Sequence, residues 1–201
     1  MLARSAWLGQ ILSYNDTGTM GTNSKFSTVS TSDSRRLHSN VRIGHVHLKV
    51  ANLDRALAFY RDVLGFELTQ RYGRQAAFLS AGGYHHHIGL NTWDSEGGAS
   101  PAGGTTGLYH LAILYPDRVE LADALRRLVD AKIPIEGASD HGVSQAIYLR
   151  DPDGNGVELY WDRPADQWPR DAIGNLAMVT EPLDLRALLA EAPTHNRNPQ
   201  A

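Results

Sequence analysis

Two histidines at matching positions of a repeated segment are the residues of this sequence best placed to do chemistry. His45 and His110 each lie near the beginning of a predicted strand, and a shift of the chain by 65 residues superposes one on the other. A single histidine on a strand is usually an ordinary core or surface residue. Two at equivalent positions of a duplicated unit can instead point into one shared cavity if the two copies pack together.

Glu158 is a third candidate, because its neighbours along the chain are apolar. It follows a turn-forming stretch, residues 151–156, and lies between Val157 and Leu159 near the start of a predicted strand. A carboxylate in such a place is costly unless it is paired or binds a metal, although on an edge strand it could simply face water. Two neutral imidazoles and one carboxylate form a facial triad. That set suits Fe2+, with Mn2+, Ni2+ and Zn2+ as competitors.

Alternating and helical patterns show which elements position the first histidine. Residues 43–50 alternate between apolar and polar, as in a half-buried strand, and Asn52 is a suitable N-cap for a helix that Gly65 ends. Three short strands follow, at about 66–71, 75–80 and 84–91. This first module, residues 42–96, therefore has the order βαβββ.

The same order returns after a glycine-rich connector at residues 97–107. A strand at 108–114 precedes a helix that begins with a capping box formed by Asp117 and Glu120. Three more strands are predicted at about 133–136, 144–150 and 157–161. The second module thus covers residues 107–162, and we expect an α+β fold built from paired βαβββ modules.

Composition separates the ends of the chain from this domain and excludes several functions. Residues 1–41 are rich in Ser and Thr and lack periodicity, which predicts a disordered or adventitious arm, with Met20 as an alternative start. Residues 163–201 form a polar tail with a short helix near 183–190. The 201 residues carry a net charge of -3 and no cysteine, which argues against nucleic-acid binding and excludes thiolate metal sites. No apolar run could span a membrane, and we expect a cytoplasmic protein.

Four motifs together resemble the vicinal oxygen chelate superfamily, which includes glyoxalase I, bleomycin-resistance proteins and extradiol dioxygenases. They are Ile-Gly-His-Val-His-Leu-Lys-Val at 43–50, Phe-Tyr-Arg-Asp-Val-Leu-Gly-Phe at 59–66, Tyr-His-Leu-Ala at 109–112 and Asp-Pro-Asp-Gly-Asn-Gly-Val-Glu-Leu at 151–159. The resemblance covers about residues 42–162 and is nearest to single-domain proteins like catechol-2,3-dioxygenase. It implies that the paired modules form an open barrel around a metal cavity.

The resemblance also implies roles for individual residues. His45, His110 and Glu158 match the three metal ligands, whereas the fourth ligand of glyoxalase I falls on Gly89, which has no side chain to offer. This difference favours the three-ligand extradiol pattern.

A run of three histidines matches the segment that carries the extradiol acid–base catalyst. The match selects His86, with His85 and His87 as rivals, because strict strand alternation would direct those two into the cavity and His86 away from it. A strand that starts only at His87 would remove this conflict. Tyr148 matches a tyrosine that hydrogen-bonds the bound substrate, and we expect His47, His85, His87 and His141 to contact substrate.

The function implied is an Fe2+-dependent extradiol dioxygenase that cleaves a catecholic ring with O2, in the catabolism of aromatic compounds. Two other functions fit the same scaffold. One is a metal-dependent lyase or thiol transferase of the glyoxalase or fosfomycin-resistance type, and the other is a metal-free module that sequesters a small molecule. The partners expected are a small-molecule substrate and O2, and the sequence also allows a homo-oligomer.

Overall fold

The computed structural model describes residues 36–194. The chain divides into two units at the boundary between Val41 and Arg42, and every helix and strand of the described residues lies in the second unit. Almost all of the arm predicted at residues 1–41, including Met20, lies outside the described residues, as does the end of the tail at 195–201.

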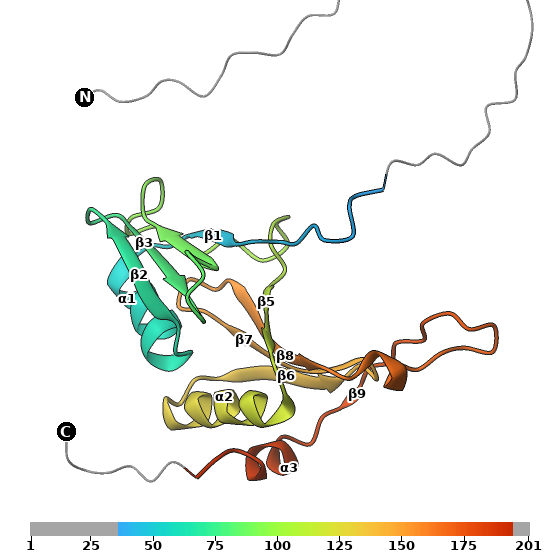
Figure 1. Cartoon of the computed structure of the whole chain (residues 1–201). Helices are drawn as coiled ribbons and strands as arrows, with labels where there is room; N and C mark the ends of the chain where they lie inside the picture. Colours follow the sequence, from blue (N-terminus) through green and yellow to red (C-terminus); the bar gives the residue numbers. More distant parts are fainter. Residues whose placement is uncertain (1–35, 195–201) are drawn as a thin grey trace, which may run out of the picture. The chain divides into compact units, whose positions relative to one another are not determined.

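The first module has the predicted βαβββ order (Figure 1). It begins with β1 (Val46–Lys49) and α1 (Leu53–Leu57), and the helix then continues as a π-helical segment, η1 (Ala58–Val63). The Asn52 side chain accepts a hydrogen bond from the Arg55 amide at 2.9 Å, which confirms it as the N-cap. Three strands complete the module: β2 (Glu67–Tyr72), β3 (Ala76–Ser80) and β4 (Ile88–Asn91).

The second module repeats this order. It contains β5 (Leu111–Tyr115), α2 (Arg118–Asp130), β6 (Ile135–Asp140), β7 (Ser144–Arg150) and β8 (Gly156–Asp162). Asp117 accepts a hydrogen bond from the Glu120 amide at 2.8 Å, so the predicted cap of α2 is confirmed. The tail adds η2 (Ala165–Gln167), β9 (Glu181–Pro182) and the predicted C-terminal helix, α3 (Leu185–Ala190).

Each module forms its own sheet, and the two sheets have the same internal order. The first sheet runs β1-β4-β3-β2 and the second runs β5-β8-β7-β6, with β9 added at its edge. In both sheets the first strand of the module pairs in parallel with the last, β1 with β4 and β5 with β8. The sheets remain separate and do not close into one barrel. Because these pairs are parallel, the start of β1 lies beside the start of β4, and the start of β5 lies beside the start of β8.

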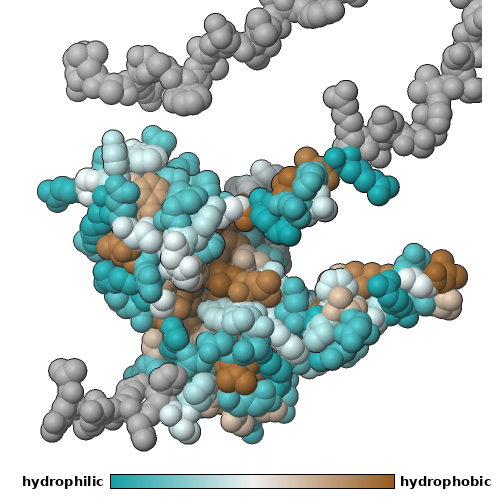
Figure 2. Space-filling view, in the orientation of Figure 1, coloured by the Kyte–Doolittle hydropathy of each residue, from teal (hydrophilic) through white to brown (hydrophobic). Residues whose placement is uncertain are grey.

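One hydrophobic core runs through both modules. α1 and η1 bury Leu53, Leu57 and Tyr60 against the first sheet, and α2 buries leucines at helical spacing against the second. Figure 2 shows that apolar surface also gathers between the parts of the molecule that carry the first sheet and α2. In the described part of the chain no helix is both long and apolar enough to cross a membrane.

A turn between β7 and β8 fastens the second module to the first, and we call it the inter-module clip. Asp151 accepts a hydrogen bond from the buried Tyr60 hydroxyl at 2.9 Å. Asp153 accepts one from the Ala51 amide at 2.9 Å and one from the Arg55 guanidinium at 2.7 Å. The clip therefore holds the start of α1 and the middle of η1 against the loop that leads into β8.

Candidate functional site

The nine residues predicted for the site lie in two separate groups, one in each module. The first-module cluster comprises five histidines, His45, His47, His85, His86 and His87. The second-module cluster comprises His110, His141, Tyr148 and Glu158. Contacts within each module hold its cluster together, and the C-terminal tail adds one to the second.

Glu158 is the centre of the second-module cluster. It lies in β8 directly opposite Tyr148 of β7, and the Tyr148 hydroxyl donates a hydrogen bond to Glu158 Oε1 at 3.1 Å. The other carboxylate oxygen, Oε2, lies 2.8 Å from Nε2 of His110. The side chains of His110 and Glu158 are 31% and 13% exposed, so a small ligand can still reach the pair.

The backbone brings His110 to Glu158. His110 directly precedes β5, and the parallel pairing of β5 with β8 sets Ala112 opposite Glu158. Gly156, at the start of β8, permits this approach, because a Cβ there would overlap the carbonyl oxygen of Tyr109. A larger residue at position 156 would push the two strand starts apart and separate the pair.

His141 joins this cluster through Tyr148. Its Nε2 lies 2.8 Å from the Tyr148 hydroxyl, and its Nδ1 lies 2.9 Å from the carbonyl oxygen of Val179. A carbonyl can only accept, so Nδ1 carries a proton and the ring orientation is fixed from the tail. Sequence patterns gave no signal for Val179, because it acts through its backbone.

Tyr148 is a hydrogen-bond donor at neutral pH. Burial, followed by the charge of Glu158, raises the pKa of Tyr148 to about 12. The phenol therefore stays protonated beside the carboxylate. It can donate to Glu158 or to an oxygen atom of a bound ligand.

His86 is the histidine of the first-module cluster that lies beside His45. The two ring centres are 4.5 Å apart, and His85 Nδ1 lies 2.7 Å from His86 Nδ1. β4 begins at Ile88, so His85, His86 and His87 all precede the strand and its alternation does not apply to them. The predicted conflict over the direction of His86 is thereby removed.

Burial and neighbouring imidazoles favour the neutral form of two of these histidines. Burial, followed by the charge of His45, lowers the pKa of His86, and His85, His47 and His87 act in the same direction. Burial and His45 likewise lower the pKa of His47. A neutral imidazole can accept a proton, so His86 is suited to act as a base.

The remaining two histidines differ in their surroundings. Nδ1 of His87 accepts a hydrogen bond from the Ala81 amide at 3.3 Å and lies 3.2 Å from Ser80 Oγ. That nitrogen is therefore engaged by the loop that follows β3. His85 packs against Tyr84, with ring centres 4.0 Å apart. Of the rivals to His86, His85 is the more exposed.

Three aromatic residues at this cluster were missed by sequence reasoning. Phe78 and Trp93 flank His47, with ring centres 5.9 and 5.6 Å away, and Phe78 also contacts His86 at 5.0 Å. Tyr84 packs against both His85 and His87. Phe78 lies opposite Gly89 in the β3–β4 pairing. The only sequence signal for its place is its alternation within β3, which does not distinguish a site residue from a core residue.

Two of the three predicted metal ligands meet in this structure. His110 and Glu158 offer an imidazole nitrogen and a carboxylate oxygen, the donors that Fe2+ and Mn2+ accept, and His110 Nδ1 is buried without a hydrogen-bond partner. His45 lies in the other cluster. Within residues 36–194 no three His, Asp or Glu side chains come close enough to hold one ion. The donor types fit a divalent metal, and the complete three-ligand site stays a prediction.

The chain is similar to proteins of known family and activity. A model of the Glyoxalase/Bleomycin resistance protein/Dioxygenase superfamily matches residues 42–159. The chain is 45% identical over 156 residues to a catechol-2,3-dioxygenase of Bacillus subtilis, which covers 78% of this chain. It is 36% identical over 124 residues, 60% of this chain, to biphenyl-2,3-diol 1,2-dioxygenase 3 of Rhodococcus globerulus.

A third relative carries a different activity. Lactoylglutathione lyase of Neisseria meningitidis serogroup A is 28% identical over 134 residues, which are 63% of this chain and 94% of the lyase. The chain spans only 54% and 63% of the lengths of the two dioxygenases.

Proposed function

Because the chain belongs to the Glyoxalase/Bleomycin resistance protein/Dioxygenase superfamily, we propose that it is a metal-dependent extradiol-type dioxygenase that cleaves a catecholic ring with O2. The second-module cluster carries this proposal: the phenol of Tyr148 and the imidazole of His110 both contact the Glu158 carboxylate. A second imidazole, that of His141, contacts the phenol. The names of the two dioxygenase relatives support the same reaction class.

The proposed metal ligands are His110, Glu158 and His45. Fe2+ is the metal we favour, and Mn2+, Ni2+ and Zn2+ suit the same donors. With three protein ligands, a bound divalent ion would keep positions for both oxygens of a catechol and for O2. Gly89 supplies no fourth ligand, which supports this open arrangement.

The chain's own residues would handle protons around the substrate. His86, whose pKa is lowered by burial and by His45, is the proposed acid–base group. Tyr148 would donate a hydrogen bond to a substrate oxygen, and His141 would hold the phenol in place from its other side. His47, His85 and His87 are proposed to line the substrate-binding surface beside Phe78 and Trp93.

His45 has to reach the His110–Glu158 pair for the site to be complete. A homo-oligomer could bring it from a second copy, and a movement between the modules could bring it from the same chain. Mixing the His45→Ala and His110→Ala variants distinguishes these two possibilities. One variant keeps His110 and the other keeps His45, so recovery of activity in the mixture means that the site forms between two copies. No recovery, with both variants folded, places it within one chain.

Metal analysis of anaerobically purified protein, paired with oxygen uptake on a panel of catechols, tests the proposed function. We expect about one Fe2+ per site and oxygen consumption with formation of a ring-opened product. Tight metal binding without oxygen uptake on any catechol would instead favour the lyase or thiol-transferase function, which the lactoylglutathione lyase relative supports. Absence of metal binding would favour a binding module. The cytoplasmic location stays a prediction.

A further inference from the structure

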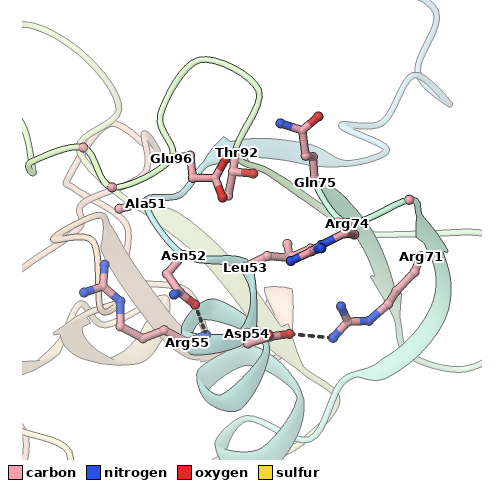
Figure 3. Close-up of a pocket in the computed structure, with 13 residues that line it drawn as sticks. Ala51, Asn52, Leu53, Asp54, Arg55, Arg71, Arg74, Gln75, Thr92 and Glu96 are labelled. Carbon is pink, nitrogen blue, oxygen red and sulfur yellow. Dashed lines mark hydrogen bonds and ion pairs between the residues drawn. The ribbon is translucent and has the colours of Figure 1, made fainter.

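A polar pocket lies at the opposite end of the first sheet from the histidines. It has a volume of about 990 Å³, and its walls come from the start of α1, the turn between β2 and β3, and the segment after β4 (Figure 3). β1 and β4 are parallel, with His45 and His86 before their first residues and the pocket residues Ala51 and Thr92 after their last. The length of a four-residue strand, about 13 Å, therefore separates the two sites.

Three arginines line this pocket, each from a different position on its wall. Arg55 comes from α1, Arg71 from β2, and Arg74 from the β2–β3 turn. Figure 3 shows the Arg74 side chain directed across the pocket toward Leu53, with Arg71 beside it.

Two of the arginines are held in place and still have donors to offer. Arg71 Nη2 contacts Asp54 Oδ1 at 2.7 Å, and Arg55 Nη2 contacts Asp153 Oδ1 at 2.7 Å. Each guanidinium has five N–H donors, so one contact leaves most of them for a ligand. The carboxylates therefore orient these two side chains without satisfying them.

Arg74 has no such partner. Within residues 36–194 its side chain makes no hydrogen bond or ion pair. The acidic residues of the pocket wall are Asp54, which Arg71 already pairs, and Glu96. Counting Asp153, which pairs with Arg55, the three arginines face three carboxylates. Arg74 is the guanidinium whose N–H donors are all left for a ligand.

We propose that this pocket binds an oxyanion, a carboxylate or phosphate group carried by a small polar molecule. A guanidinium presents pairs of parallel N–H donors that match the oxygens of either group. Asn52, Gln75 and Thr92 add polar side chains around the same cavity, which favour a ligand with further hydroxyl or amide groups. The site is independent of the proposed metal site, because the two share no residue.

Calorimetric titration of the full chain tests the proposal, with inorganic phosphate and succinate as probes at constant ionic strength. We expect saturable binding of at least one probe, and the probe that binds identifies the group recognised. Arg74→Gln breaks no ion pair, so it should keep the parent's thermal unfolding temperature while weakening binding by about tenfold or more. Arg186→Gln, on the exposed surface of α3, removes the same charge and should bind as the parent does.

The proposal is overturned if neither probe binds saturably, or if Arg74→Gln binds as tightly as the parent. It is also overturned if His110→Ala abolishes oxyanion binding, because that would place the ligand at the histidines. With His110→Ala, we expect binding equal to that of the parent. This outcome does not depend on whether the protein consumes oxygen, so the two proposals can fail separately.

Discussion

The imidazole of His47 occupies the space that a side chain at position 89 would need. A Cβ built on Gly89 would lie 2.9 Å from His47 Cγ, and the two residues are direct partners in the β1–β4 pairing. The position where glyoxalase I carries its fourth ligand is thus covered by a histidine ring here. The His47 ring can take this place only because residue 89 is a glycine.

Gly89→Ala should destabilise the protein by about 1–3 kcal/mol, because the new methyl group forces the His47 ring out of its place. The same substitution in a His47→Ala background should cost far less, since the clash is gone. Urea unfolding of the four proteins in this double-mutant cycle measures the coupling. Gly103→Ala, in the open connector, is the matched control. An equal cost in both backgrounds would contradict the arrangement.

Tyr148→Phe should weaken metal binding or activity by about 10–100-fold, as removal of a group that orients a ligand commonly does. The phenol both donates to Glu158 and contacts His141, so its loss frees both side chains. Metal titration and oxygen uptake measure the effect. Tyr72→Phe removes an exposed hydroxyl from β2 and serves as control. If Tyr148→Phe matched the parent in both assays, the hydrogen bonds to Glu158 and His141 would have no role in function.

His86→Ala should retain metal while kcat falls by about 10²–10⁴-fold, the usual contribution of a general acid–base group. His110→Ala should instead lose the metal, because it removes a ligand. Metal content and steady-state oxygen uptake of the same preparations separate the two effects. A His86→Ala enzyme that works at the parent rate, beside an inactive His85→Ala or His87→Ala enzyme, would transfer the acid–base role to that neighbour.

Tyr60→Phe should destabilise the protein by about 1–3 kcal/mol at neutral pH, because it removes the buried hydroxyl that donates to Asp151 Oδ2 and leaves that oxygen only the side-chain amide of Asn155. Burial, and then the charge of Asp151, raise the pKa of Tyr60 well above its usual value of 10.0. The unfolded chain therefore loses this proton first as pH rises. The stabilisation is complete below about pH 10 and declines above it.

The free-energy gap between parent and Tyr60→Phe should consequently narrow above about pH 10. Urea unfolding at a series of pH values on both sides of pH 10 measures the gap. Tyr72→Phe, again the exposed control, should show a small and nearly constant difference. A free-energy gap that widened above about pH 10 would show that folding does not raise the pKa of Tyr60.

Periodicity and caps predicted the order of elements well, because both are local signals. Asn52 and Asp117 cap their helices as expected. The end of a strand depends on its partner, which the local pattern does not contain. β1 begins at Val46, three residues later than predicted, because β4 begins only at Ile88, and Ile43 is left 97% exposed.

The candidate site likewise has a part that local patterns predict and a part that they do not. Tyr148 and Glu158 lie on neighbouring strands of one module, and His110 directly precedes the strand beside Glu158, so the pattern of that module brings them together. The meeting of His45 with His110 depends on how two modules pack, which no spacing within either module determines. In this structure the two histidines belong to different clusters.

The inter-module clip imposes an order of events while the chain is being made. Tyr60 and Asp151 are 91 residues apart, and Ala51 and Asp153 are 102 apart. At about 5–20 residues per second, a ribosome needs roughly 5–20 s to add that length. During this interval the first module must keep its buried tyrosine without the carboxylate that will accept the hydrogen bond of its hydroxyl. A nascent chain stalled before residue 151 would lack that anchor, and it would expose to chaperones a helix start that the finished protein protects.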